Sequence, residues 1–279
     1  MEFRKAERRK AKLRLALTGP AGSGKTYGAL LIAFGLGGKI AMIDTENSSG
    51  DLYSSLGDYD ICYLSAPYDT SKYLKAIHDA EKASYDILII DSLSHAWNGE
   101  GGLLDLQSKL ADTKYRGNSY AAWREVTPLH NRLINAMLSS SCHIIATMRS
   151  KTEYIQTENE RGRTEIRKVG LAPVQREGMD YEFGTVFDLA PNHMANVSKD
   201  RTSMFDGNIF TITQETGKKL RDWLDNGVDV ERRNQLYRSY LEKYEGSTEQ
   251  TMDAMLKITE GRASKDWTKQ DMDKLAAGL

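Results

Sequence analysis

Short apolar runs alternate with longer amphipathic stretches along the first part of the chain. The apolar runs are rich in β-branched residues and too short for helices, so they predict buried strands. Such strands separated by helices are typical of a parallel sheet covered on both faces. The expected strands are Leu13–Thr18, Lys39–Asp44, Asp60–Leu64, Asp86–Asp91 and Cys142–Met148, and the expected helices are Thr26–Leu36, Ser71–Ala83 and Tyr120–Leu138.

The pattern changes twice toward the C-terminus. Shorter apolar runs separated by turn residues predict an antiparallel extension of the sheet. These runs are Thr185–Leu189, Met194–Ser198 and Asn208–Thr213. Beyond residue 227 only helical spacing remains, over Glu231–Tyr244, Thr248–Glu260 and Thr268–Ala277, and the last helix opens with a Thr268/Asp271 capping pattern. We therefore expect a basic arm over residues 1–12, an α/β core over 13–228 and a helical region over 229–279.

Charge and composition exclude some classes of protein. The 38 basic and 39 acidic residues nearly cancel, which argues against a protein that coats polyanions through bulk charge. Residues 1–14 do carry seven basic side chains, which fit either a solvated tail or an arm that touches nucleic acid or a neighbouring subunit. Cys62 and Cys142 form no CxxC motif and are expected to be reduced core thiols. No apolar run approaches the ~20 residues of a membrane span, so we expect a cytoplasmic protein without membrane contact.

A glycine-rich motif between the first strand and the first helix predicts a phosphate site. G-P-A-G-S-G-K-T matches the P-loop pattern, in which backbone N–H groups and a helix N-terminus surround an anion. The lysine would reach the β- and γ-phosphates, and the last hydroxyl would bind Mg²⁺. We expect ATP and Mg²⁺ as cofactors. The expected nucleotide contacts are Gly19, Pro20, Ala21, Gly22, Ser23, Gly24, Lys25, Thr26 and Tyr27.

Two carboxylates follow strands that should neighbour this loop. Asp91 ends the run I-L-I-I-D and has the form of a Walker B residue, the second anchor of Mg²⁺ beside Thr26. Glu46 follows K-I-A-M-I-D, at the carboxyl end of a strand, where sheets of this kind bind ligands. Glu46 is thus a candidate for polarising the attacking water. A surface glutamate without a catalytic role is the alternative.

The succession G-P-A-G-S-G-K-T, I-D-T-E and I-I-D-S resembles the RecA-type recombinase core. This resemblance implies that Glu46 is the catalytic base. It also implies two DNA-facing loops, which correspond to Asn98–Asn118 and Ser150–Gln175. The phrases D-S-L-S-H-A-W, G-E-G-G-L-L, A-T-M-R-S-K-T-E-Y, V-G-L-A-P-V-Q-R and Y-E-F are similar to a family of phage-encoded AAA-type ATP-binding proteins with a RecA-like core, some of them single-strand annealing or recombination proteins.

The likeness covers about residues 10–226 and implies several partners. They are single-stranded DNA, further copies of the chain in a ring or filament, and a single-stranded-DNA-binding protein. The implied setting is the cytoplasm of an infected or lysogenic bacterium. Lys199 and Arg201 match the K-x-R element that RadA and DnaB-type helicases present to ATP on the neighbouring subunit. An exposed charged turn is the alternative, and Arg176 is a second finger candidate.

The sequence departs from RecA where RecA carries an amide side chain before its second loop. This chain has Thr147, with Arg149 beyond it. The candidate second loop and the two residues after it, 150–177, hold six basic and five acidic residues, so each subunit should make few contacts to DNA phosphates. The candidate DNA contacts are Lys151, Tyr154, Arg161, Arg163, Arg167 and Lys168.

Two other functions remain open from the sequence. A nucleotide-dependent switch or loader that acts on a protein partner, without gripping DNA, would fit the near-neutral charge and the helical tail. A small-molecule phosphotransferase would need an arginine-rich lid, and no segment has that pattern.

Overall fold

The computed structural model describes residues 6, 8–158, 164–264 and 267–279, with backbone alone for 152–158 and 164–171. The chain forms two compact units. One is Lys12–Arg221, and the other combines the described residues before Lys12 with Asp222–Leu279.

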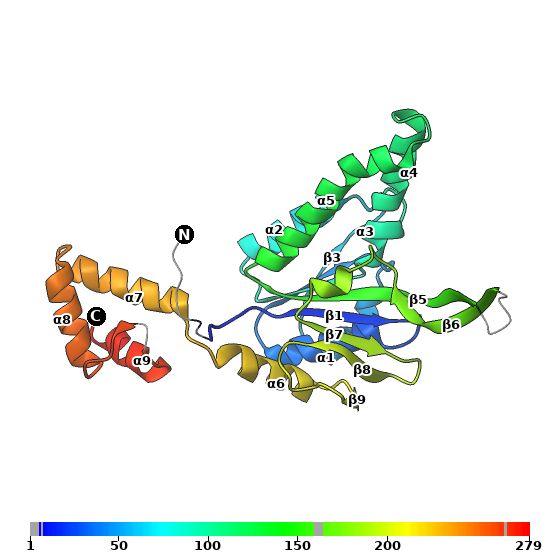
Figure 1. Ribbon diagram of the computed structural model, residues 1–279. Helices are drawn as coiled ribbons and strands as arrows, with labels where there is room; N and C mark the ends of the chain where they lie inside the picture. The colour runs from blue at the N-terminus through cyan, green and yellow to red at the C-terminus, as the bar shows by residue number, and fades with distance from the viewer. Residues whose placement is uncertain (1–5, 7, 159–163, 265–266) are drawn as a thin grey trace. The chain divides into compact units, whose positions relative to one another are not determined.

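A mostly parallel sheet forms the centre of the larger unit (Figure 1). Its strands follow the order β3-β2-β4-β5-β1-β7-β8-β9, and β6 pairs with β5 alone. The strands are β1 (Arg14–Gly19), β2 (Ile40–Asp44), β3 (Asp60–Tyr63), β4 (Ile87–Asp91), β5 (His143–Glu158), β6 (Thr164–Pro173), β7 (Thr185–Leu189), β8 (Met194–Asp200) and β9 (Ile209–Thr211). The pairs from β3 to β7 are parallel, whereas β8 and β9 are antiparallel. The predicted sheet with its antiparallel extension is confirmed.

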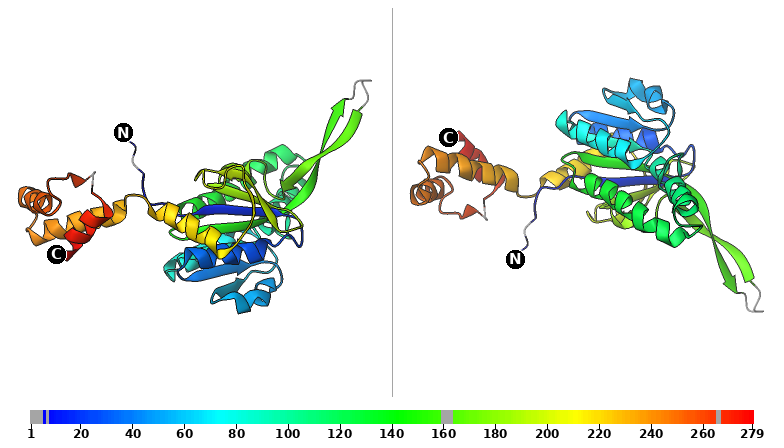
Figure 2. Two further views of the ribbon diagram at one scale, coloured as in Figure 1. Left: turned by 90° about the horizontal axis from the view of Figure 1, so that it is seen from below. Right: turned by 90° about the horizontal axis from the view of Figure 1, so that it is seen from above.

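Helices cover both faces of this sheet (Figure 2). The helices that begin in the larger unit are α1 (Lys25–Leu36), α2 (Thr70–Lys82), α3 (Ser94–Asn98), α4 (Leu103–Thr113), α5 (Ser119–Ser139) and α6 (Gln214–Asp225). Apolar side chains of α2 and α5, such as Tyr73, Ile77 and Leu133, pack with Ile90 and Ile144 of the sheet in one core. Burial of this apolar surface is the main stabilising contribution.

Two glycines let α1 and α6 touch through their backbones on the other face. A Cβ atom added to Gly35 would lie 2.0 Å from the carbonyl oxygen of Gln214. One added to Gly217 would lie 2.2 Å from the carbonyl oxygen of Ile32. Neither distance is compatible with a side chain, so close helix packing requires glycine at both positions.

Both stretches expected to be DNA-facing loops are largely regular structure, which corrects the prediction that they are loops. In residues 98–118, the helix α4 follows a glycine-rich turn, and the apolar spacing of L-L-D-L-Q-S-K-L-A is helical. In residues 150–175, β5 and β6 form a long antiparallel hairpin from Ser150 and Pro173 to Glu158 and Thr164 (Figure 1). Its β-branched and aromatic residues have high strand propensity, which offsets the charges between them.

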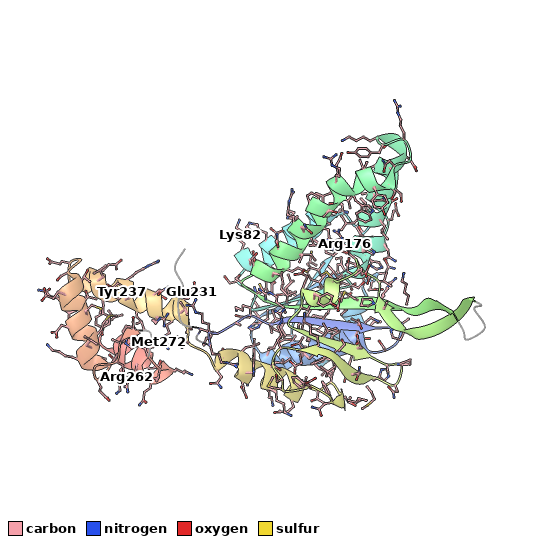
Figure 3. The ribbon with its side chains drawn as sticks, in the orientation of Figure 1. Lys82, Arg176, Glu231, Tyr237, Arg262 and Met272 are labelled. Carbon is pink, nitrogen blue, oxygen red and sulfur yellow. The ribbon has the colours of Figure 1, made fainter. Side chains whose placement is uncertain are left out.

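The smaller unit contains α7 (Val230–Lys243), α8 (Thr248–Ile258) and α9 (Lys269–Ala277). Their core consists of Leu236, Tyr240, Met255, Trp267, Met272 and Leu275. Tyr237 packs against this core, and it is labelled with Met272 in Figure 3. The predicted capping box is present, because Thr268 and Asp271 each accept a hydrogen bond from the other's backbone N–H. None of the described helices is long and apolar enough to cross a membrane.

Candidate nucleotide site

The P-loop connects β1 to α1 and has the conformation that an anion requires. Gly22 and Gly24 have φ of 74° and 85°, in the left-handed region that glycine adopts without strain. Gly24 is the N-cap of α1, so the free N–H groups of the first helical turn point into the loop. The Ser23 hydroxyl is buried and has no hydrogen-bond partner among the described residues. A hydroxyl without a partner, beside the backbone N–H groups of the loop, is suited to donate a hydrogen bond to a bound phosphate chain.

Lys25 is held inside this loop by a carbonyl group. Its Nζ donates a hydrogen bond to the Pro20 carbonyl oxygen at 2.8 Å. Burial lowers the pKa of Lys25, and the nearby carboxylates of Asp91 and Glu46 partly oppose this effect. The ammonium group therefore lies among acidic side chains at the loop, where phosphate oxygens would be stronger partners than a carbonyl.

Asp91 joins the P-loop to the central strands. One of its carboxylate oxygens accepts a hydrogen bond from the Thr26 hydroxyl at 2.6 Å, and the other accepts one from the Thr147 hydroxyl. The carboxyl is 2% exposed, and burial raises its pKa against the effect of these hydrogen bonds. A cation beside Asp91 would stabilise the ionised form. Thr26 and Asp91 together offer the hydroxyl and carboxylate oxygens that Mg²⁺ prefers.

Glu46 forms an ion pair with Arg149, a contact that the sequence pattern does not indicate. Arg149 Nε donates to Glu46 Oε1 at 3.0 Å, and a guanidinium nitrogen contacts the second oxygen. Burial alone would raise the pKa of Glu46, but the hydrogen bonds and charge of Arg149 outweigh burial and lower it. Asp44 positions the backbone here, because its Oδ1 accepts from the N–H of Glu46 at 2.6 Å.

A further polar cluster lies beside the ends of β2 and β4. The hydroxyl of Thr45 is 2.7 Å from His95 Nδ1 and accepts from the Ser92 N–H at 2.8 Å. The His95 ring stacks on Tyr68 with 4.8 Å between centroids. Burial lowers the pKa of His95, and the charge of Arg149 acts in the same direction. Both effects favour the neutral imidazole. The only sign of His95 in the sequence was its position four residues after Asp91.

Lys199 and Arg201 do not reach the P-loop of their own chain. The β7–β8 register pairs Leu189 with Ala195 and Thr185 with Asp200, so β8 ends at the sheet edge opposite the P-loop. Lys199 Nζ donates to the carbonyl oxygens of Asp180 and Tyr181 at 3.1 and 2.6 Å. Any contact that these cations make with ATP would thus involve another subunit.

The guanidinium carbon of Arg176, which is labelled in Figure 3, lies 5.7 Å from the ring centroid of Trp123 in α5. Of the candidate DNA contacts, Lys151 is exposed at the base of the β5–β6 hairpin. Tyr154, Arg167 and Lys168 lie on the hairpin strands, for which the backbone is described. Arg161 and Arg163 lie outside the described residues.

A cavity of about 420 Å³ adjoins the P-loop and is lined in part by residues of β7 and β9. It is lined by Gly22, Ser23, Gly24, Tyr27, Gly28, Tyr53, Leu189, His193, Thr211 and Ile212. Of these residues, the sequence had indicated the P-loop glycines, Ser23 and Tyr27. Tyr53 and His193 reach the site only through folding.

Comparisons with known proteins agree with this geometry. Residues 11–254 match the model of a protein family described as an AAA domain. The comparison with curated proteins gives no match. The matched range contains the P-loop, Asp91 and the whole central sheet. The chain belongs to this AAA domain family and is a P-loop NTPase.

Proposed function

We propose that the protein hydrolyses ATP with Mg²⁺ and couples hydrolysis to single-stranded DNA, as an assembly with ATP between adjacent subunits. One observation carries the proposal. The strand β5 contacts Asp91 through Thr147 and Glu46 through Arg149, and then continues into the β5–β6 hairpin. The strand β5 thus connects the candidate hydrolytic site to the β5–β6 hairpin, whose sequence contains both basic and acidic residues.

The side chains divide the chemistry at this site. The P-loop N–H groups and Lys25 bind the phosphates, and Thr26 with Asp91 would hold Mg²⁺. Held there, Mg²⁺ would supply positive charge to neutralise the charge that develops on the phosphoryl oxygens. Glu46 takes the proton of the attacking water. Because Arg149 occupies the carboxylate of Glu46, this ion pair must loosen before Glu46 can act, and a γ-phosphate near Arg149 would compete for the guanidinium.

Coupling to DNA would use the hairpin. Arg149 directly precedes Ser150, where the β5–β6 pairing begins. A movement of Arg149 would therefore displace the base of the hairpin. The hairpin region from residue 150 to 175 carries basic residues at Lys151, Arg161, Arg163, Arg167 and Lys168. With nearly as many acidic residues beside them, binding would depend on summing weak phosphate contacts over several subunits.

The test is steady-state ATP hydrolysis with and without single-stranded DNA, over a range of protein concentration. We expect DNA to stimulate turnover, and activity to rise more than linearly with protein. Lys25→Ala should lose at least about 100-fold in activity because it removes phosphate stabilisation. Glu46→Gln should lose roughly 100- to 10,000-fold in kcat while still binding ATP. A Glu46→Gln variant with wild-type turnover would remove Glu46 from the mechanism.

A nucleotide-dependent switch that acts on a protein partner is the second candidate. The near balance of charge around the hairpin, six basic against five acidic residues, favours it. In that case ATP binds, DNA changes neither turnover nor affinity, and a partner is captured in one nucleotide state only.

A further inference from the structure

Three aromatic side chains of α3 and α5 pack against one another and against an arginine. The rings of Trp97 in α3 and Trp123 in α5 are stacked, with 5.7 Å between their centroids and an interplanar angle of 22°. The ring of His130 meets Trp97 edge-on at 5.9 Å, and the Arg176 guanidinium lies beside Trp123. Both tryptophans and Arg176 are only half-buried, so this aromatic cluster is partly open to solvent.

The inner end of the aromatic cluster contains an unpaired polar side chain. His130 is 7% exposed, and neither of its ring nitrogens has a hydrogen-bond partner within 3.5 Å among the described residues. Buried polar groups of a completed core are almost always paired. A cluster that served only to fill the core would gain stability from an apolar side chain at this position. Core packing alone therefore does not account for the aromatic cluster.

An exposed tyrosine continues the aromatic cluster along α5. Tyr120 lies three residues before Trp123, so the two side chains are neighbours on the helix surface. Tyr120 is 89% exposed, at the end of α5 that projects away from the sheet (Figure 1). Its backbone is held by the helix cap, in which Asn118 Oδ1 accepts from the Ala121 N–H at 3.1 Å. The start of α5 thus presents an aromatic ring to solvent from a fixed backbone.

The charge of the neighbouring hairpin indicates which ligand such rings would bind. Residues 150–177 carry six basic and five acidic side chains, which leaves few cations for DNA phosphates. A protein that binds single strands with few phosphate contacts must gain affinity from the bases. Aromatic rings and arginine guanidinium planes are the groups on which unpaired bases stack.

Arg176 connects the aromatic cluster to the hairpin and to the hydrolytic site. It lies just beyond the end of β6, where the Val174 N–H donates to the Arg149 carbonyl oxygen at 2.6 Å. The adjacent Gln175 donates from Nε2 to the carbonyl oxygen of Leu93 at 3.2 Å, two residues after the end of β4. A ligand that displaces Arg176 would therefore act on the segment that contacts both β4 and Arg149.

We propose that Tyr120, Trp123 and Arg176 form a stacking platform for the unpaired bases of single-stranded DNA. The inference rests on the proposed function, which names this partner and assigns its phosphates to the hairpin. The platform adds contacts to the faces of the bases, which are similar for every sequence. Bases of a duplex are already stacked on one another, so the platform selects single strands.

The experiment measures the affinity of the full chain for two labelled oligonucleotides by fluorescence anisotropy in the presence of Mg²⁺-ATP. One is oligothymidylate, and the other is an abasic strand of the same length and backbone. The wild type should bind oligothymidylate more tightly. Tyr120→Ala should weaken that binding by roughly 5- to 150-fold, the range of one lost base stack, and should keep the affinity for the abasic strand. Tyr120→Phe should bind as the wild type because it retains the ring.

Salt dependence separates stacking from charge. Tyr120→Ala removes no phosphate contact, so its affinity should fall with salt as steeply as that of the wild type. A shallower salt dependence in Tyr120→Ala would contradict a stacking role.

Tyr63→Ala is the matched control, since Tyr63 is 54% exposed on the edge strand β3 and does not belong to the platform. It should change neither affinity. Equal wild-type affinities for the two oligonucleotides would overturn the inference, as would unchanged oligothymidylate binding in Tyr120→Ala. Parallel loss of both ligands in Tyr120→Ala would also overturn it, because the lost contact would not be to a base. A wild-type protein that binds neither oligonucleotide would instead defeat the proposed coupling to DNA.

Discussion

The ion pair between Glu46 and Arg149 sets the chemical state of the proposed base. Arg149 is 48% exposed at its side chain and Glu46 is 25% exposed, so the pair lies at the boundary between site and solvent. Within this setting Arg149 keeps Glu46 ionised and weakly basic. In the proposed mechanism, Glu46 therefore cannot act as a base until Arg149 pairs with another anion.

Replacing Arg149 should change the pH dependence of hydrolysis. Glu46 acts as a base only when ionised, so the rate falls as pH falls through its pKa. Arg149 lowers that pKa and burial raises it. With Arg149→Ala, burial dominates, and the acidic limb of kcat/KM should move to higher pH.

The control for this prediction is Arg124→Ala, an exposed arginine on α5. Arg124→Ala should leave the acidic limb of the kcat/KM–pH profile unchanged. The profiles of Arg149→Ala and Arg124→Ala are both measured without DNA. An unchanged acidic limb in Arg149→Ala would separate Glu46 from the titration that controls the rate.

The candidate carboxylates could be predicted from sequence because parallel strands end at a common edge. The register pairs Asp44 with Asp91, and Gly19 with Arg149, at that edge. The partner of Glu46 could not be predicted in the same way. Arg149 is 103 residues away from Glu46 along the chain, and the expected end of its strand was Met148. Contacts of this kind depend on strand order, which apolar patterning does not determine.

At the scale of elements, buried strands and amphipathic helices followed the apolar pattern closely. The errors fell on the β5–β6 hairpin and on α4, where charged residues and glycines dilute that pattern. A two-stranded ribbon that projects from a sheet has little apolar surface to bury, so its sequence resembles a loop. The α6 helix was also missed, because its turns are dominated by charged residues.

The cap of α9 provides a test of stability at this scale. Asp271 is buried and accepts hydrogen bonds from the Thr268 N–H at 2.8 Å and from Arg262 Nη2 at 2.6 Å. Burial would raise the pKa of Asp271, but these hydrogen bonds outweigh it and lower the pKa. The stabilisation is thus present above the unfolded-state pKa and is lost as pH falls through the folded-state value.

Asp271→Ala should destabilise the α7–α9 unit by about 2 kcal/mol, because a charged hydrogen-bond acceptor and a helix cap are removed together. Hydrogen exchange of the α7–α9 amides measures this change. Asp253→Ala, which removes an exposed partner of Lys257, should have an effect below about 0.5 kcal/mol. Equal protection of α9 in both variants would contradict the role of the cap.

For the whole molecule, the position of β8 bears on the proposed assembly of several copies. Lys199 and Arg201 lie at the edge opposite the P-loop, and Arg201 is exposed. A cation there can stabilise a phosphoryl group only on another copy of the chain. A head-to-tail arrangement, in which each copy contributes a different surface, is the geometry of rings and filaments.

Mixing two inactive variants tests this arrangement. Lys25→Ala lacks a working P-loop, and Arg201→Ala lacks the proposed finger, so each alone should be nearly inactive. In an equal mixture, random assembly would create intact interfaces in about a quarter of cases. We expect about a quarter of wild-type hydrolysis to return. A mixture as inactive as its components would place Arg201 outside the neighbouring site.

The backbone contact between α1 and α6 bears on how this protein can change over evolutionary time. Gly35 lies at the end of α1 far from the P-loop and faces Gly217 of α6, and neither position leaves room for a methyl group. Substitution of either glycine would therefore be selected against, even though neither residue contacts the nucleotide. A second substitution could not rescue the first, because the obstacle at each glycine is the main chain of the facing helix.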